Sequence, residues 1–290
     1  MIDLHLHTIY SDGASSVEDI LRAAQEVGLS VISITDHGNV DAYKELNDER
    51  IRGLFKGEIL NGVEITTHYK GEVIEILAYK FDMEIMKRLL AENVLCEEEK
   101  HIKEFPIIKE KFDKLGIKYN VDNVISDLER KNKHCKTIFY KEFIKYPENN
   151  KFLLNSDAIK RAGRFIRDEL NNPKSKLFIN QTSLLPSLDE AITMVHEAGG
   201  LAFLAHPFAY SSNIIESLED MTREYKLDGV EALYTTKSQK QANYIIQFCD
   251  KNNLLKCGGS DYHGAMNRKN KIGTGYGCMR IPRELIKDWH

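Results

Sequence analysis

Short apolar runs alternate with amphipathic stretches over the first eighty residues of the chain. Apolar runs at 2–7, 31–35, 59–65 and 73–79 predict four strands. Ser15-Ser16-Val17-Glu18 has the spacing of a capping box and Gly28 suits a helix end, so a helix is expected between them. A second helix is predicted over 40–50. Strands that alternate with helices are typical of parallel βα units.

The last hundred residues resume this rhythm, with predicted helices at 187–198 and 238–252 and strands at 201–205, 229–234 and 255–259. The stretch between is rich in Lys, Glu, Asn, Phe and Tyr and has helical periodicity without a strand series. We therefore expect one α/β domain in two parts, with a helical insertion between them. A run of long barrel helices is the alternative. The expected boundaries are 1–94, 95–185 and 186–290.

Composition narrows the class of protein. Apolar residues make up 42% of the 290 positions, which excludes a wholly disordered chain. Forty basic and 44 acidic residues give a net charge of −4, which argues against a protein that coats DNA or an anionic membrane. Five cysteines without a CxxC pair argue against a disulfide framework or a thiolate zinc site. With neither a signal peptide nor a long apolar run, we expect a cytoplasmic protein without a membrane span.

The first strand carries two histidines, His5 and His7, at positions i and i+2. The period of two in a strand places both imidazoles on one face. Ile2, Leu4 and Leu6 are expected on the other face. A strand that buries one face and presents two imidazoles on the other is a typical metal-ligand arrangement, although two polar residues on a solvated edge have the same pattern.

Further metal-ligating side chains lie at or just beyond the carboxyl ends of the predicted strands, the first strand included. These residues are Asp12, His37, Glu64, His206, Asp261 and His263. In an α/β barrel the carboxyl ends of the strands converge on one face, where the active site lies. The pattern therefore predicts a single polyhistidine and carboxylate site, and no nucleophile elbow or P-loop competes with it.

These segments together resemble a known family. The motifs are His-Leu-His-Thr with Ser-Asp-Gly, then Ile-Thr-Asp-His, Gly-Val-Glu, Ala-His-Pro and Gly-Gly-Ser-Asp-Tyr-His. In this order they resemble the polymerase and histidinol phosphatase (PHP) family of metal-dependent phosphoesterases. The resemblance implies a distorted (β/α)7 barrel with two to three divalent metal ions, drawn from Mn, Fe, Zn or Mg, and hydrolysis of a phosphate ester by metal-activated hydroxide.

Within the family, the long insertion and the Gly-Gly-Ser-Asp-aromatic-His ending look most like the bacterial branch that hydrolyses nucleotide phosphates or trims short RNA from its 5′ end. The chain departs from that branch because the insertion has no Gly-Arg-Pro-His segment. A histidinol-phosphate phosphatase is the alternative enzyme. A non-catalytic, metal-binding regulatory PHP module is the alternative of another class. The expected partner is a small phosphate ester, and no obligate protein partner is indicated.

The resemblance also implies three ligand sets. His5, His7, Glu64 and Asp261 match the first, and Asp12, His37 and His263 match the second. Glu64 and His206 match the third, together with one residue in the strand after Glu64. Relatives usually have histidine there, whereas this chain has Glu75, which we favour over His68 in the adjoining loop. A carboxylate at that position suits Mn, Mg or Fe better than Zn.

The remaining expectations concern the reaction and its surroundings. Asp261 or His206 is expected to move the proton. Arg268, Lys269 and Lys271 follow the last motif and are expected to contact the substrate phosphate. Alternation turns Asp36 away from the ligand face, so we expect it to support a ligand or cap a helix. Glu231 is expected to be a polar residue at the barrel mouth without a defined role.

Overall fold

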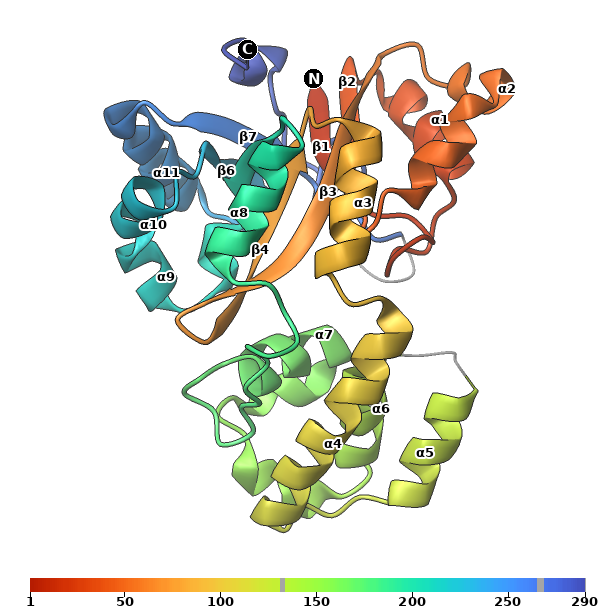
Figure 1. Cartoon of the computed structure of the whole chain (residues 1–290), viewed down its shortest axis with the longest axis vertical. Helices are drawn as coiled ribbons and strands as arrows, with labels where there is room; N and C mark the ends of the chain where they lie inside the picture. Colours follow the sequence, from red (N-terminus) through yellow and green to blue (C-terminus); the bar gives the residue numbers. More distant parts are fainter. Residues whose placement is uncertain (131–133, 265–268, 290) are drawn as a thin grey trace. The chain divides into compact units, whose positions relative to one another are not determined.

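The computed structural model describes residues 1–130, 134–264 and 269–289. Its compact parts are one unit of Met1–Thr67, Ile74–Glu92 and Leu188–His290, and a second of His68–Val73 and Asn93–Ser187. The first unit holds a seven-stranded sheet in the order β1 to β7 (Figure 1). The strands are β1 Ile2–Leu6, β2 Val31–Ile34, β3 Glu58–Tyr69, β4 Glu72–Tyr79, β5 Leu201–Leu204, β6 Gly229–Tyr234 and β7 Leu255–Gly259.

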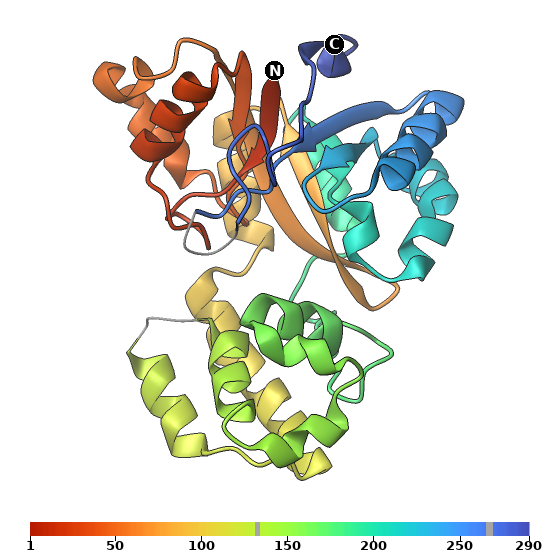
Figure 2. The same ribbon diagram turned by 180° about the vertical axis from the view of Figure 1, so that it is seen from behind.

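The sheet curls into a nearly closed barrel. Strands β1 to β3 are parallel, and so are β5 to β7. Just beyond β7, the backbone of Tyr262 bonds to His5 and His7, which joins the last strand to β1. Helices α1 (Val17–Val27) and α2 (Glu49–Arg52) flank the β1–β2 side, and α9 to α11 flank the β6–β7 side (Figures 1 and 2). The predicted distorted barrel is therefore confirmed.

Strand β4 departs from the expected parallel series. It follows β3 through a two-residue turn, Lys70-Gly71, in which both residues have positive φ, as a tight hairpin requires. β4 then pairs antiparallel with β5. β3 is also longer than predicted, so Glu64 lies within the strand instead of at its end. Glu64 still faces the carboxyl end of β2, where it forms an isolated bridge with His37.

The helices of this unit follow the predicted pattern with local changes. Helix α1 is capped by Ser16 and Asp19, one residue later than the expected box. Residues 40–50 form a 3-10 helix, Asp41–Asn47, and the short α2 in place of one regular helix. The other helices are α3 Met83–Asn93, α8 Leu188–Glu197, α9 Ser212–Glu216, α10 Leu218–Glu224 and α11 Gln239–Asn252.

The apolar residues of β1 do not share one environment, contrary to the alternation expected. The pairing of β1 with β2 shifts register between Asp3 and Leu6. Leu4 accordingly packs in the cluster that contains Tyr79, whereas Leu6 packs in the cluster that contains Ile20 of α1. Every residue of β1 is buried, and so is His7 just beyond it, so both histidines lie inside the barrel and not on a solvated face.

The second unit is helical and has its own core. Its helices are α4 Glu97–Leu115, α5 Val121–Glu129, α6 Cys135–Phe143 and α7 Ala162–Phe165, followed by a π-helical turn at Ile166–Leu170. Phe112, Phe139, Phe143 and Phe165 are buried together in that core. The middle of the chain therefore forms a helical insertion and not a series of barrel helices.

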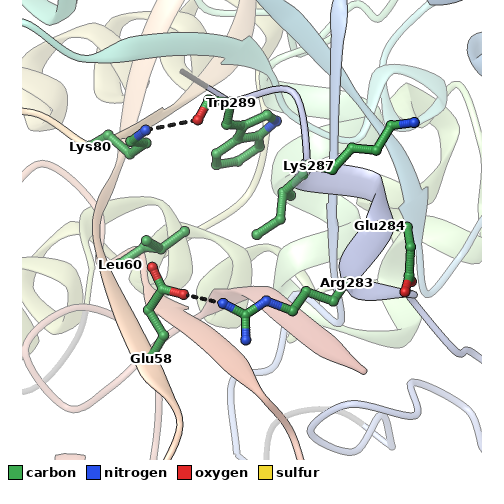
Figure 3. Close-up of a pocket in the computed structure, with 8 residues that line it drawn as sticks. Glu58, Leu60, Lys80, Arg283, Glu284, Lys287 and Trp289 are labelled. Atoms are coloured by element: carbon green, nitrogen blue, oxygen red, sulfur yellow. Dashed lines mark hydrogen bonds and ion pairs between the residues drawn. The ribbon is translucent and has the colours of Figure 1, made fainter.

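A cavity of about 390 Å³ lies at the amino-terminal end of the parallel strands (Figure 3). Glu58 at the start of β3 pairs with Arg283 across it, and Lys80 after β4 donates to the carbonyl of Trp289. None of the predicted metal ligands lines this cavity. Within the described ranges, no helix is long and apolar enough to cross a membrane.

Candidate metal centre

The first predicted ligand set comes together at the carboxyl end of β1. Nε2 of His5 and Nε2 of His7 each lie 3.2 Å from Oε2 of Glu64. The same two nitrogens each lie 3.6 Å from Oδ1 of Asp261, which follows β7. Four side chains, positioned by three strands, therefore bring their donor atoms together at one candidate ion position.

The second set gathers around Asp12, in the loop after β1. Oδ1 of Asp12 lies 3.1 Å from Nε2 of His263 and 3.7 Å from Nε2 of His37. Nδ1 of His7 lies 3.7 Å from the same oxygen. Since His7 directs Nε2 at the first set and Nδ1 at the second, its imidazole joins the two.

The third set contains Glu75. Nε2 of His206 lies 3.1 Å from Oε1 of Glu64 and 3.3 Å from Oε2 of Glu75. The other oxygen of Glu75 lies 3.8 Å from Nδ1 of His37. Because β4 runs antiparallel to β5, its amino-terminal half carries Glu75 to the rim that the carboxyl ends of the other strands form. His68, which was expected in the loop, instead lies within β3 near its carboxyl end, and it belongs to no candidate metal group of the described residues.

The separations between these donor atoms suit first-row divalent ions. Donors about 2.0–2.2 Å from one ion lie about 3.0–3.5 Å from each other in tetrahedral or octahedral geometry. The shortest contacts in the three sets, 3.1–3.2 Å, fall within that range. Among the described residues, Nε2 of His5 and both ring nitrogens of His7 are buried without a hydrogen bond. Buried polar atoms rarely lack a partner, so the cluster fits bound cations.

The electrostatics of His7 and Glu64 favour the same conclusion. Burial, with the neighbouring His263 and His37 imidazoles, lowers the pKa of His7 to about 3, so its ring is neutral. Burial alone would raise the pKa of Glu64, but the nearby His5, His37 and His206 hold it well below its usual value. Neutral imidazoles beside ionised carboxylates are the ligand forms that divalent ions require.

His206 differs from His7. Burial would lower the pKa of His206, but hydrogen bonds and charge from Glu64 and Glu75 raise it to about 10. Its backbone is also unusual, since φ is +23°, in the region that side chains rarely adopt. Asp261 follows β7 with a φ of +54°. Strained residues of this kind concentrate at functional sites, where the surrounding structure holds them in place.

Two further carboxylates support the cluster without entering any candidate metal group of the described residues. Asp36, as alternation predicted, turns away and accepts bonds from the backbone and hydroxyl of Thr8 and the hydroxyl of Ser11. It thereby holds the loop that carries Asp12. Glu231 bonds to both His5 and His206, a role that the sequence analysis missed. The signal was present, since Gly229-Val230-Glu231 repeats the pattern Gly62-Val63-Glu64.

The predicted phosphate contacts are only partly described. Arg268 lies outside the described residues, and Lys269 and Lys271 are exposed. Between them, the side-chain amide of Asn270 donates to the carbonyls of Ser260 and Asp261. This bond fixes the loop beside the last ligand motif, but the role of the two lysines stays a prediction.

Comparison with known families shows to which protein family the chain belongs. Residues 3–253 match the model of the PHP domain. The chain belongs to the PHP family. The resemblance drawn from the motifs is thus confirmed at the level of the family, and seven of the nine candidate ligands lie within the matched residues.

Several PHP relatives cover most of the chain. A 5′-3′ exoribonuclease of Haemophilus influenzae is 25% identical over 268 residues, which is 90% of this chain and 89% of the relative. A 3′,5′-nucleoside bisphosphate phosphatase of Chromobacterium violaceum is 24% identical over 98% of this chain and 96% of its own. The expectation of a metal-dependent phosphoesterase is confirmed at the level of the family, and these two relatives are named for RNA and nucleotide substrates and not for histidinol phosphate.

The fold of this chain is also similar to that of a solved structure. A solved structure from Chromobacterium violaceum, described as an amidohydrolase with bound sulfate and no metal, superposes with a TM-score of 0.69. The match covers 98% of this chain and 95% of that one at 22% identity. At that identity the likeness concerns the fold alone, and it agrees with the barrel of the PHP family.

Proposed function

We propose that this protein hydrolyses a phosphate ester of a nucleotide or short oligonucleotide with two to three divalent ions bound at the carboxyl end of its barrel. The observation that carries the proposal is the convergence of nine ligating side chains, with donor atoms 3.1–3.8 Å apart. The proposed ligands are His5, His7, Asp12, His37, Glu64, Glu75, His206, Asp261 and His263.

The proposed ions occupy the three sets described above, with Glu64 shared between the first and the third. Glu75 gives the third set two carboxylates and one imidazole, counting Glu64 and His206. Hard oxygen ligands favour Mn, Mg or Fe over Zn. We propose Mn, Mg or Fe at this position.

The chemistry divides between the ions and the protein. Divalent ions, when bound, supply the acidification of water and the stabilisation of phosphoryl charge that hydrolysis needs. The chain positions the ester and moves protons. His206 and Asp261 reach the centre from the ends of β5 and β7 and are the proposed proton carriers. Lys269 and Lys271 are the proposed contacts of the substrate phosphate.

The decisive experiment compares substrates with Mn²⁺-supplemented protein. We expect turnover of a 3′,5′-bisphosphonucleotide or a 5′-phosphorylated short RNA to exceed turnover of histidinol phosphate. Turnover of histidinol phosphate alone would support the alternative enzyme. Bound Mn²⁺ without hydrolysis of any of these esters, or of p-nitrophenyl phosphate, would support the non-catalytic module.

Two variants provide the control. His7→Ala removes a proposed ligand of the first ion, so activity should disappear while the fold remains. His196→Ala removes an imidazole on α8 that bonds to Asp228 and belongs to no candidate metal group of the described chain. Its activity should match that of the parent, and equal losses in both variants would contradict the assignment.

A further inference from the structure

Glu231 is a fully buried carboxylate in the middle of β6. Its two oxygens bond to two different candidate ligands, His5 from β1 and His206 after β5. We propose that Glu231 is a positioning residue that fixes the tautomer of His5 and the backbone of His206, so that both present Nε2 to divalent ions. The proposal rests on the proposed function, because it concerns the same metal centre.

The contact with His5 determines which ring nitrogen can bind a cation. Nδ1 of His5 lies 3.0 Å from Oε1 of Glu231. A carboxylate accepts a hydrogen bond from the proton on Nδ1, so an imidazole that binds a cation here does so through Nε2. Nε2 then carries its lone pair toward Glu64 and Asp261, 3.2 and 3.6 Å away. Carboxylates that hold a metal-ligating histidine in this way also orient its ring.

The contact with His206 acts on the backbone. The N–H of His206 donates to Oε2 of Glu231 at 2.7 Å. This residue has φ +23° and ψ +62°, a conformation that costs free energy unless the surroundings compensate. The short bond to the buried carboxyl group provides that compensation. It holds Nε2 of His206 3.1 Å from Glu64 and 3.3 Å from Glu75.

Nothing in the described part of the chain makes Glu231 a ligand itself, since it belongs to no candidate metal group. A buried carboxylate is costly unless its oxygens are bonded. Here both oxygens are used by the two ligand residues, and β6 lies between β5 and β7 in the sheet. One side chain thus couples the positions of two ligands from separate strands.

The substitution Glu231→Gln tests this coupling with almost no change of shape. The backbone N–H of His206 cannot accept, so the amide oxygen of Gln will face it, and the amide NH₂ will face Nδ1 of His5. Nδ1 must then accept, which moves the proton to Nε2 and blocks ligation there. We expect Mn²⁺ affinity, followed by electron paramagnetic resonance of free Mn²⁺, to fall by about 10–100-fold.

Glu169→Gln is the matched control. Glu169 is also fully buried, and it accepts bonds from the backbone of Leu154 and Asn155 and the hydroxyl of Ser175, all within the insertion. The same atomic change should cost stability without altering Mn²⁺ affinity. An equal loss of affinity in both variants would mean that general destabilisation, and not positioning, explains the effect.

A second measurement needs no variant. Nitrogen-15 spectra of the parent loaded with diamagnetic Zn²⁺ should place the proton of His5 on Nδ1. A proton on Nε2 would overturn the proposal, and so would parental Mn²⁺ affinity in a folded Glu231→Gln variant. A parent that binds no Mn²⁺ would instead refute the proposed function. If Glu231→Gln does not fold, the spectrum of His5 decides.

Discussion

Glu75 is the position where this chain departs from the PHP pattern, and its variants provide the sharpest test of the third ligand set. Its oxygens lie 3.3 Å from Nε2 of His206 and 3.8 Å from Nδ1 of His37. The sets around Asp12 and Asp261 do not include Glu75. Glu75→Ala should therefore empty one ion position and spare the others.

The magnitude follows from the number of ligands lost. Removing even a supporting partner of a metal ligand typically weakens affinity by about 10–100-fold, or about 1.4–2.7 kcal/mol. Removing a ligand should cost at least as much. At a Mn²⁺ concentration near the dissociation constant of this position in the parent, the position is half filled, so elemental analysis of dialysed Glu75→Ala should find about half an ion fewer per chain than in the parent.

Glu75→His restores a ligand but exchanges a hard oxygen for an imidazole nitrogen. Imidazole suits Zn, whereas oxygen donors suit Mn and Mg. The ratio of Zn-supported to Mn-supported phosphoesterase activity should therefore rise above that of the parent. Parental preference in a Glu75→His protein with full metal content would contradict a ligand role for Glu75.

His68→Ala is the comparison that separates the two sequence alternatives. We expect parental metal content and activity, since His68 is absent from the candidate groups of the described residues. If His68→Ala empties a position while Glu75→Ala keeps every ion, then His68 is the ligand, and the assignment of the third set is refuted.

Three further predictions use the same protein. Elemental analysis after Mn²⁺ supplementation should find two to three divalent ions per chain, and fewer than one would refute a multinuclear centre. His7→Ala should lose metal while circular dichroism shows an unchanged fold. Leu4→Ala should keep metal binding but lose ~2–5 kcal/mol of unfolding free energy in denaturant titrations, because Leu4 is fully buried in the barrel cluster. Chelation should lower the midpoint of thermal unfolding, since ligand at 100 times its dissociation constant stabilises the folded state by about 2.7 kcal/mol; an unchanged midpoint would argue against bound ions in the folded parent.

The sequence by itself determined the elements and much of the candidate centre. A short apolar run is a local property of the chain, so all seven strands could be predicted from such runs. The position of His37 and His206 just after their strands predicted that they would lie in one cluster, where both contact Glu64, because the carboxyl ends of parallel strands converge. Asp36 could be assigned a supporting role because neighbouring residues in an extended chain point to opposite sides.

Features that depend on pairing between distant segments, such as strand direction and register, were decided only by the tertiary structure. The antiparallel β4, which carries Glu75 to the rim, follows from a hairpin and from hydrogen bonds to β5, far along the chain. The register shift that separates Leu4 from Leu6 exists only where β1 meets β2. Glu64 and Glu231 share one sequence pattern, yet one faces the ligand cluster directly and the other bonds behind two of its histidines. Local patterns cannot distinguish them, because the role of each carboxylate is set by the strands packed beside it.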